Sequence, residues 1–131
     1  VQAAIWGYSL ALDLTLRDVQ AELKKLGRPW ELAKGFDGAC PVAGFVSKEK
    51  VVKPQQLAFQ LQVNGETRQH GNTASMIRGI SQLISEMSRH FTLLPGDIVL
   101  TGTPAGVGPL HSGDALQLQL GDLFSVNSKV Y

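Results

Sequence analysis

A run of apolar residues at every second position, followed by Asn-Gly, constrains the fold of this chain more than any other feature. The apolar positions are Leu57, Phe59, Leu61 and Val63. A period of two is typical of a strand with one buried face. Asn64-Gly65 favours a type I′ turn, because both residue types tolerate the positive φ angles that this turn requires. The segment predicts a hairpin with strands over 57–63 and 66–70.

Apolar periodicity predicts the remaining elements. We expect strands over 3–12, 98–102, 115–120 and 124–130, and helices over 16–26 and 74–90. Thr15 and Asp18 resemble a capping box for the first helix, and Gly27 is a natural stop. Thr73 or Ser75 can cap the second helix. Residues 28–44 contain three glycines and two prolines, which indicates an irregular loop. Strands and helices in irregular alternation predict an α+β fold.

Composition excludes several classes of protein. A chain of 131 residues has the usual size of one domain, and a net charge of +1 gives no nucleic-acid footprint. The only cysteine, Cys40, excludes an internal disulfide and fits a reducing compartment, so we expect a cytoplasmic protein with Cys40 as a small buried thiol. No apolar run is long enough to span a membrane, so no membrane partner is expected.

The first residues suggest that the chain begins within a fold. Val1 is not an initiator methionine, and the apolar strand pattern starts at once, with Ala3 and Ala4. We therefore expect an N-terminal portion to precede Val1.

A loop rich in glycine, proline and threonine follows Pro95-Gly96-Asp97 and the short apolar run 98–100. The loop contains Gly102, Thr103, Gly106 and Gly108. Glycine allows backbone to approach a ligand closely, and threonine supplies a hydroxyl group. The loop lacks the Lys-Ser or Lys-Thr of a phosphate loop and the third glycine of a dinucleotide fingerprint. It is therefore either an ordinary turn or one wall of a site for a small anion.

Charged residues gather where the first strand meets the first helix. Asp13 ends an apolar stretch, where a carboxylate needs a partner, water or a metal ion. Arg17 and Gln20 are three residues apart and share a helix face, and the Arg side chain can bind a carboxylate. A purely local alternative has Asp18 capping the helix and Arg17 pairing with Asp13.

Lys34 lies among apolar residues and glycines, so it is either a solvated charge or a cation held in a pocket for an anion or enolate. The three histidines are far apart in the sequence, and no serine nucleophile elbow is present. We assign no catalytic role to a histidine.

Four segments in order resemble the fumarylacetoacetate hydrolase family and span about residues 5 to 120. They are Asp13-x-Thr15-x-Arg17-Asp18-x-Gln20, Ala33-Lys34-x-Phe36-Asp37, Val63-Asn64-Gly65-Glu66 and the stretch from Pro95-Gly96-Asp97 to Gly108. Pro29-Trp30 and Cys40-Pro41 resemble its short single-domain branch, which includes acylpyruvate hydrolases and oxaloacetate decarboxylases. The resemblance implies a mixed β-sandwich roll with two short flanking helices, and a single catalytic domain over 1–131 without its N-terminal portion.

The resemblance also implies a site for small 2-oxo acids that depends on Mg²⁺, Mn²⁺ or Ca²⁺. By it, Asp13 is a metal ligand, Lys34 stabilises the developing enolate, and Arg17, Gln20, Gly102 and Thr103 bind the substrate. The family's Glu-x-Glu metal ligands and its His and Glu on a lid are absent from these 131 residues. We expect them upstream of Val1.

The reaction implied by the resemblance is metal-dependent hydrolysis of a carbon–carbon bond in acylpyruvates, such as fumarylpyruvate or acetylpyruvate, with decarboxylation of oxaloacetate as a second activity. An isomerase or decarboxylase of 2-oxo acids from aromatic degradation is an alternative. A non-catalytic β-rich module that lost the metal ligands is another. Members of the family are commonly dimers, so a homodimer is expected.

Overall fold

The computed structural model describes all residues, Val1–Tyr131, and the chain divides into two compact units. The sheet unit comprises Val1–Leu10 and Phe45–Tyr131, and the helical unit comprises Ala11–Gly44. Strands and helices occur together in irregular order, as expected for an α+β fold.

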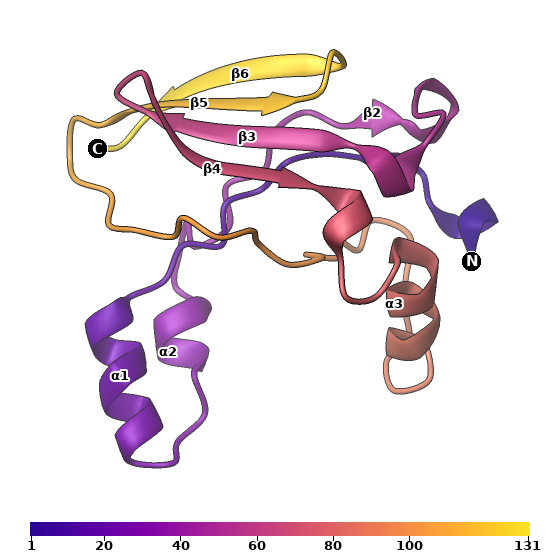
Figure 1. Cartoon of the computed structure of the whole chain (residues 1–131). Coiled ribbons are helices and arrows are strands. Elements are labelled where there is room, and N and C mark those ends of the chain that lie inside the picture. The colour runs from indigo at the N-terminus through magenta and orange to yellow at the C-terminus, as the bar shows by residue number, and fades with distance from the viewer. The chain divides into compact units, whose positions relative to one another are not determined.

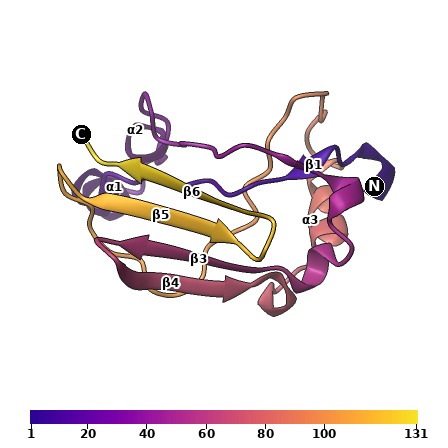
Figure 2. The same ribbon diagram turned by 90° about the horizontal axis from the view of Figure 1, so that it is seen from above.

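Four antiparallel strands form the sheet of the sheet unit (Figures 1 and 2). They are β3 (Ala58–Val63), β4 (Glu66–Asn72), β5 (Ala115–Leu120) and β6 (Phe124–Lys129), in the order β4-β3-β5-β6. The predicted hairpin and the two C-terminal strands are confirmed. Asn64 and Gly65 have φ angles of 53° and 84°, as a type I′ turn requires.

The two faces of this sheet differ because side chains alternate along each strand. One face carries the core residues Leu61, Val63, Leu116, Leu118 and Leu120. The other carries amide side chains, of which Gln60 donates a hydrogen bond to Gln119 across the β3–β5 pair at 2.9 Å. Burying each large apolar side chain contributes roughly 1.5–3 kcal/mol, so the apolar face stabilises the sheet.

The N-terminal strand is much shorter than the predicted 3–12. A 3₁₀ turn occupies Gln2–Ala4, and only β1 (Gly7–Tyr8) pairs, with β2 (Val46–Ser47). Gly7 lies against Val46, where a Cβ atom would be 2.5 Å from the Val46 carbonyl oxygen. Short 3₁₀ helices at Lys48–Lys50 and Pro54–Gln56 follow β2. No helix in the structure has both the length and the apolar character needed to cross a membrane.

The helix predicted over 74–90 is also shorter in the structure. Residues Thr73–Ser75 form a 3₁₀ turn, and α3 begins only at Ile80 and ends at Met87. Gln55, distant in sequence, accepts a hydrogen bond from the Ile80 amide at 3.0 Å and donates one to the Thr73 carbonyl oxygen. The Thr73 hydroxyl donates to the Pro54 carbonyl oxygen and accepts from the Leu57 amide, so it cannot cap the helix.

The expected strand over 98–102 is wrong. This stretch has no regular structure, and Ile98 and Leu100 are about half exposed, at 51% and 47%. An apolar run becomes a strand only where a neighbouring strand supplies its backbone hydrogen bonds. The sheet order β4-β3-β5-β6 contains no strand from this segment.

The helical unit contains α1 (Arg17–Lys25) and α2 (Glu31–Lys34). The amide of Gly27 donates to the Lys24 carbonyl oxygen and that of Arg28 to the Leu23 carbonyl oxygen, and Gly27 has φ of +62°. This is a Schellman end, which confirms the predicted stop. The capping box is wrong, because Leu16 is the N-cap residue and no side chain caps the helix. The predicted loop over 28–44 contains α2, one turn long.

Asn64→Ala should lower the free energy of unfolding by about 1–2 kcal/mol, because alanine tolerates positive φ poorly and forms no side-chain hydrogen bonds. Asn64 donates to the Asp114 carboxylate at 2.8 Å and accepts from the Ala115 amide at 2.9 Å. Urea denaturation at pH 7 measures the loss, and Asn64→Gly, which suits the turn, should lose less. Equal midpoints for Asn64→Ala and the wild type would contradict this account of the turn.

The stabilisation from the hydrogen bond between Asn64 and the Asp114 carboxylate should also depend on pH. Hydrogen bonds from the His111 amide and from Asn64 hold the pKa of Asp114 below its ordinary value of 3.8. The stabilisation is therefore complete above that ordinary value and is lost as pH falls through the lower folded pKa. The difference between wild type and Asn64→Ala should therefore shrink in a denaturation series as the pH is lowered below 3.8, the ordinary pKa of Asp114.

Candidate functional site

Two backbone segments of the helical unit lie side by side and carry the charged residues of the predicted site. The amides of Leu12, Leu14 and Leu16 donate to the carbonyl oxygens of Pro41, Ala39 and Ala33 at 3.0, 2.9 and 3.1 Å. Ala33 lies in the single turn of α2 and is fully buried. This ladder holds the segment before α1 against the residue that precedes Lys34.

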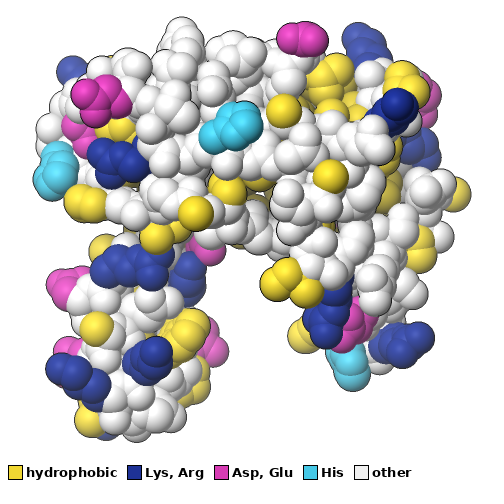
Figure 3. All heavy atoms as spheres, viewed as in Figure 1, with side chains coloured by type: hydrophobic (Ala, Val, Ile, Leu, Met, Phe, Trp, Pro, Cys, Tyr) yellow, Lys and Arg dark blue, Asp and Glu magenta, His cyan; other side chains and the backbone are white.

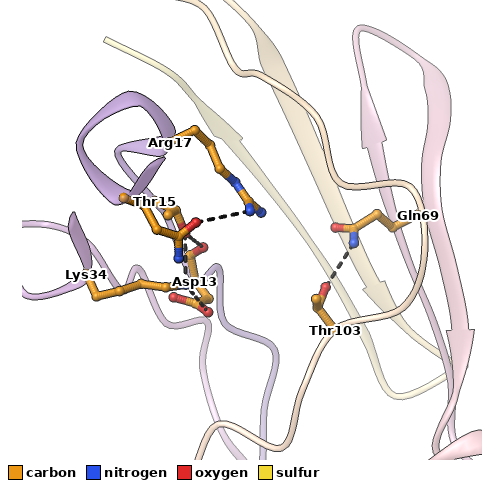
Figure 4. Close-up of polar contacts among 7 residues, drawn as sticks. Asp13, Thr15, Arg17, Lys34, Gln69 and Thr103 are labelled. Atoms are coloured by element: carbon orange, nitrogen blue, oxygen red, sulfur yellow. Dashed lines mark hydrogen bonds and ion pairs between the residues drawn. The ribbon is translucent and has the colours of Figure 1, made fainter. Parts of the chain in front are cut away.

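Asp13, Thr15 and Lys34 form one hydrogen-bonded cluster (Figure 4). Asp13 and Thr15 are two residues apart in an extended segment, so their side chains share a face. The Lys34 ammonium donates to Asp13 Oδ2 at 2.8 Å and to Thr15 Oγ1 at 2.9 Å. The Thr15 hydroxyl in turn donates to the Asp13 carbonyl oxygen at 3.2 Å. Two site residues that lie 21 positions apart in the sequence are thus brought together.

The cluster has unused capacity to bind a ligand. An ammonium group has three N–H donors, and these two hydrogen bonds use two of them. The side chains of Lys34 and Asp13 are 32% and 51% exposed, so both remain accessible. An exposed pair contributes only about 0–1 kcal/mol to stability. The arrangement can therefore serve an anionic ligand at little cost to the fold.

Arg17 and Gln20 lie together on α1, as their spacing predicts. Arg17 Nη1 donates to Gln20 Oε1 at 3.4 Å. A surface hollow of about 490 Å³ is lined by Arg17, Gln20, Ala21, Lys24 and Trp30, and Figure 3 shows Lys and Arg side chains gathered over this unit. The alternative pairing of Arg17 with Asp13 is wrong, because Asp13 is bound to Lys34.

Thr103 lies in the glycine-rich loop of the sheet unit, where Gln69 of β4 holds it. Gln69 Nε2 donates to Thr103 Oγ1 at 2.9 Å and to the Pro104 carbonyl oxygen at 3.0 Å (Figure 4). Gly102 has φ of +117°, a backbone conformation that L side chains rarely adopt. Gly106 packs on the Arg68 carbonyl group, and a Cβ atom there would overlap its oxygen.

Asp13 suits a hard divalent cation, but it is only one ligand. Mg²⁺ takes six oxygen ligands and usually keeps several waters among them. No group of three or more His, Cys, Asp or Glu side chains in the chain gathers as a metal cluster would. A divalent cation at Asp13 would therefore need further oxygen ligands from outside the Lys34 cluster. Cys40 is exposed, so the expected buried thiol is wrong.

Two residues, Thr15 and Gln69, contact the candidate site residues although the sequence did not predict these contacts. The capping-box pattern predicts that Thr15 caps α1. Its position two residues after Asp13 in an extended stretch could instead have indicated that it shares a face with Asp13 and contacts Lys34. Gln69 has no comparable signal, because it contacts Thr103 across 34 positions of sequence. Only the tertiary structure reveals the hydrogen bond between Gln69 and Thr103.

The family model "Fumarylacetoacetate (FAA) hydrolase C-terminal" matches residues 1–131. The chain belongs to the fumarylacetoacetate hydrolase family. Oxaloacetate tautomerase YcgM of Escherichia coli is 59% identical over 88% of this chain and 53% of its own length. The human mitochondrial oxaloacetate tautomerase FAHD1 is 52% identical over 96% of this chain and 57% of its own length.

Solved structures of the fumarylacetoacetate hydrolase family have the same fold. Fumarylpyruvate hydrolase of Pseudomonas aeruginosa, in complex with Mn²⁺ and pyruvate, aligns with a TM-score of 0.90 at 38% identity, over 95% of this chain and 54% of that one. A Yersinia pestis structure described under the family name aligns with a TM-score of 0.97 at 55% identity, over 100% and 62%. The chain spans just over half the length of the curated relatives it matches.

Proposed function

We propose that the intact protein is a divalent-metal enzyme that converts small 2-oxo acids through an enolate. The observation that carries this proposal is the Lys34 ammonium, held at 2.8 Å from Asp13 and 2.9 Å from Thr15, with one N–H left for a ligand. Placing a fixed cation where an oxyanion develops is one of the strongest forms of catalytic stabilisation. In this proposal Lys34 donates to the enolate oxygen.

The other residues bind the metal and the substrate. Asp13 is the metal ligand on this chain, and two glutamates upstream of Val1 complete the set. When bound, Mg²⁺ or Mn²⁺ polarises the 2-oxo group. Arg17 and Gln20 of α1 hold the substrate, and Thr103 and the backbone at Gly102 bind its carboxylate. The Mn²⁺ in the fumarylpyruvate hydrolase structure supports the metal assignment.

Several reactions can proceed through this enolate. The name of the relative that is 59% identical favours keto–enol tautomerisation of oxaloacetate. Hydrolysis of fumarylpyruvate or acetylpyruvate, the reaction implied by the sequence resemblance, is supported by the fumarylpyruvate hydrolase structure. In hydrolysis, water adds to the second carbonyl, the carbon–carbon bond breaks, and pyruvate leaves as its enolate. Isomerisation or decarboxylation of a related 2-oxo acid passes through the same charge.

One assay series separates these reactions. The intact protein with Mg²⁺ is given the enol form of oxaloacetate, then acetylpyruvate and fumarylpyruvate, with EDTA-treated enzyme as the control. Loss of enol absorbance without CO₂ indicates a tautomerase, CO₂ release a decarboxylase, and pyruvate from acylpyruvates a hydrolase. No metal-dependent turnover of any of these compounds would overturn the proposal and favour the non-catalytic module.

The assembly and location proposals are separate from the chemistry. We propose a homodimer, which sedimentation of the intact protein tests. A cytoplasmic location remains a prediction, since the names of several relatives place them in mitochondria.

A further inference from the structure

We propose that Gln69 is a positioning residue that fixes the direction of the Thr103 hydroxyl proton: Thr103 accepts a hydrogen bond from Gln69 and so has its own hydrogen free to donate to an anion. The inference rests on the proposed function, in which Thr103 binds a substrate carboxylate. It adds the residue that makes Thr103 competent for this role.

The hydrogen bonds of Gln69 determine which way its amide lies. Its nitrogen is 3.0 Å from the Pro104 carbonyl oxygen, and a backbone carbonyl only accepts. The group that faces the loop must therefore be the NH₂ and not the oxygen of the side chain. The same nitrogen lies 2.9 Å from Thr103 Oγ1. An NH₂ group has two hydrogens, and these two contacts account for both.

This assignment leaves the Thr103 hydroxyl one proton to give. Its oxygen accepts from Gln69, so its own hydrogen points away from the amide. A carboxylate has only acceptor sites, and it can bind Thr103 only through that hydrogen. Without Gln69 the hydroxyl group can rotate, and a bound anion must order it. Gln69 thus prepares the donor before the ligand arrives.

The backbone of β4 holds Gln69 in place. Leu61 pairs with Gln69 but Gln62 pairs with Thr67, so the ladder skips Arg68 and forms a bulge. Bulges re-aim the side chains of a strand, and this one is adjacent to Gln69. The loop packs directly on the bulge, since a Cβ on Gly106 or Gly108 would overlap Arg68. The donor of the hydrogen bond is therefore on a paired strand, and the acceptor is on a loop that the strand supports.

The test compares Gln69→Leu, Gln69→Glu and Thr103→Val in the intact Mg²⁺-loaded protein, with KM and kcat measured for the 2-oxo acid that the intact protein turns over in the proposed assay series. Thr103→Val should raise KM about tenfold or more, as loss of a hydrogen bond to a charged group does. Gln69→Leu should raise KM about three- to tenfold with kcat within about threefold, because uniform binding is weakened. Gln69→Glu should raise KM further, because its carboxylate accepts the hydrogen bond from the Thr103 hydroxyl and repels the anionic substrate.

The double variant and the melting temperature complete the design. Adding Gln69→Leu to Thr103→Val should leave KM unchanged, because the hydroxyl that Gln69 orients is gone. Unchanged KM in both Gln69 variants, or additive effects in the double variant, overturns the positioning role while the proposed function stands. A Gln69→Glu protein that melts normally but loses only kcat also overturns it. If Thr103→Val itself leaves KM unchanged, Thr103 does not bind the substrate carboxylate. The proposed role of Thr103 and the positioning role of Gln69 are then both overturned.

Discussion

Lys34→Ala should lower kcat of the intact protein by about 10²–10³-fold, the usual cost of removing one donor to a developing oxyanion. The protein should still fold, because the Lys34–Asp13 pair is partly exposed and such pairs add only about 0–1 kcal/mol. Steady-state kinetics with the 2-oxo acid that the wild type turns over measure the first effect, and thermal denaturation measures the second.

Two matched variants make the Lys34 result specific. Lys34→Met keeps most of the apolar stem and should lose as much activity as Lys34→Ala, because only the ammonium acts on the enolate. Lys50→Ala removes an exposed lysine from the sheet unit and should leave kcat unchanged. A Lys34→Ala protein that cannot fold would mark the residue as structural, and normal turnover would remove it from the mechanism.

Asp13→Ala should abolish the Mg²⁺ dependence together with turnover, because it removes the proposed metal ligand on this chain. Asp13→Asn is the sharper test, since its amide oxygen can still accept from Lys34 but carries no charge for the cation. Calorimetric titration with Mn²⁺ should show weaker binding to both variants. The activity assay should show a loss of kcat on the order of 10²-fold or more, because metal catalysis is lost.

Asp122→Asn provides the control for charge. Asp122 is exposed in the turn between β5 and β6, so its substitution changes the net charge equally without touching the Lys34 cluster. Its Mn²⁺ affinity and kcat should match those of the wild type. Unchanged activity in Asp13→Ala would contradict the metal assignment and leave Asp13 as the partner of Lys34 alone.

The sequence by itself determined the elements that depend on near neighbours. The β3–β4 hairpin follows from alternation and from two residues that accept positive φ, 53° and 84°. The end of α1 follows from Gly27, whose φ of +62° closes the Schellman hydrogen bonds. In each case the deciding interactions lie within a few residues. The family and the candidate site residues could also be predicted from the sequence, because each motif is a short contiguous segment and the four motifs occur in order.

Tertiary structure alone decided the features that depend on distant partners. The start of α3 depends on Gln55, which bonds the Ile80 amide 25 positions away, and so the helix is shorter than its apolar pattern. The apolar run at Ile98 forms no strand, because no neighbour in the sheet pairs with it. Lys34 bonds Asp13 across 21 positions, and Gln69 orients Thr103 across 34. Hydrogen-bonded pairs of this kind leave no period in the sequence, since they form only after the chain has folded.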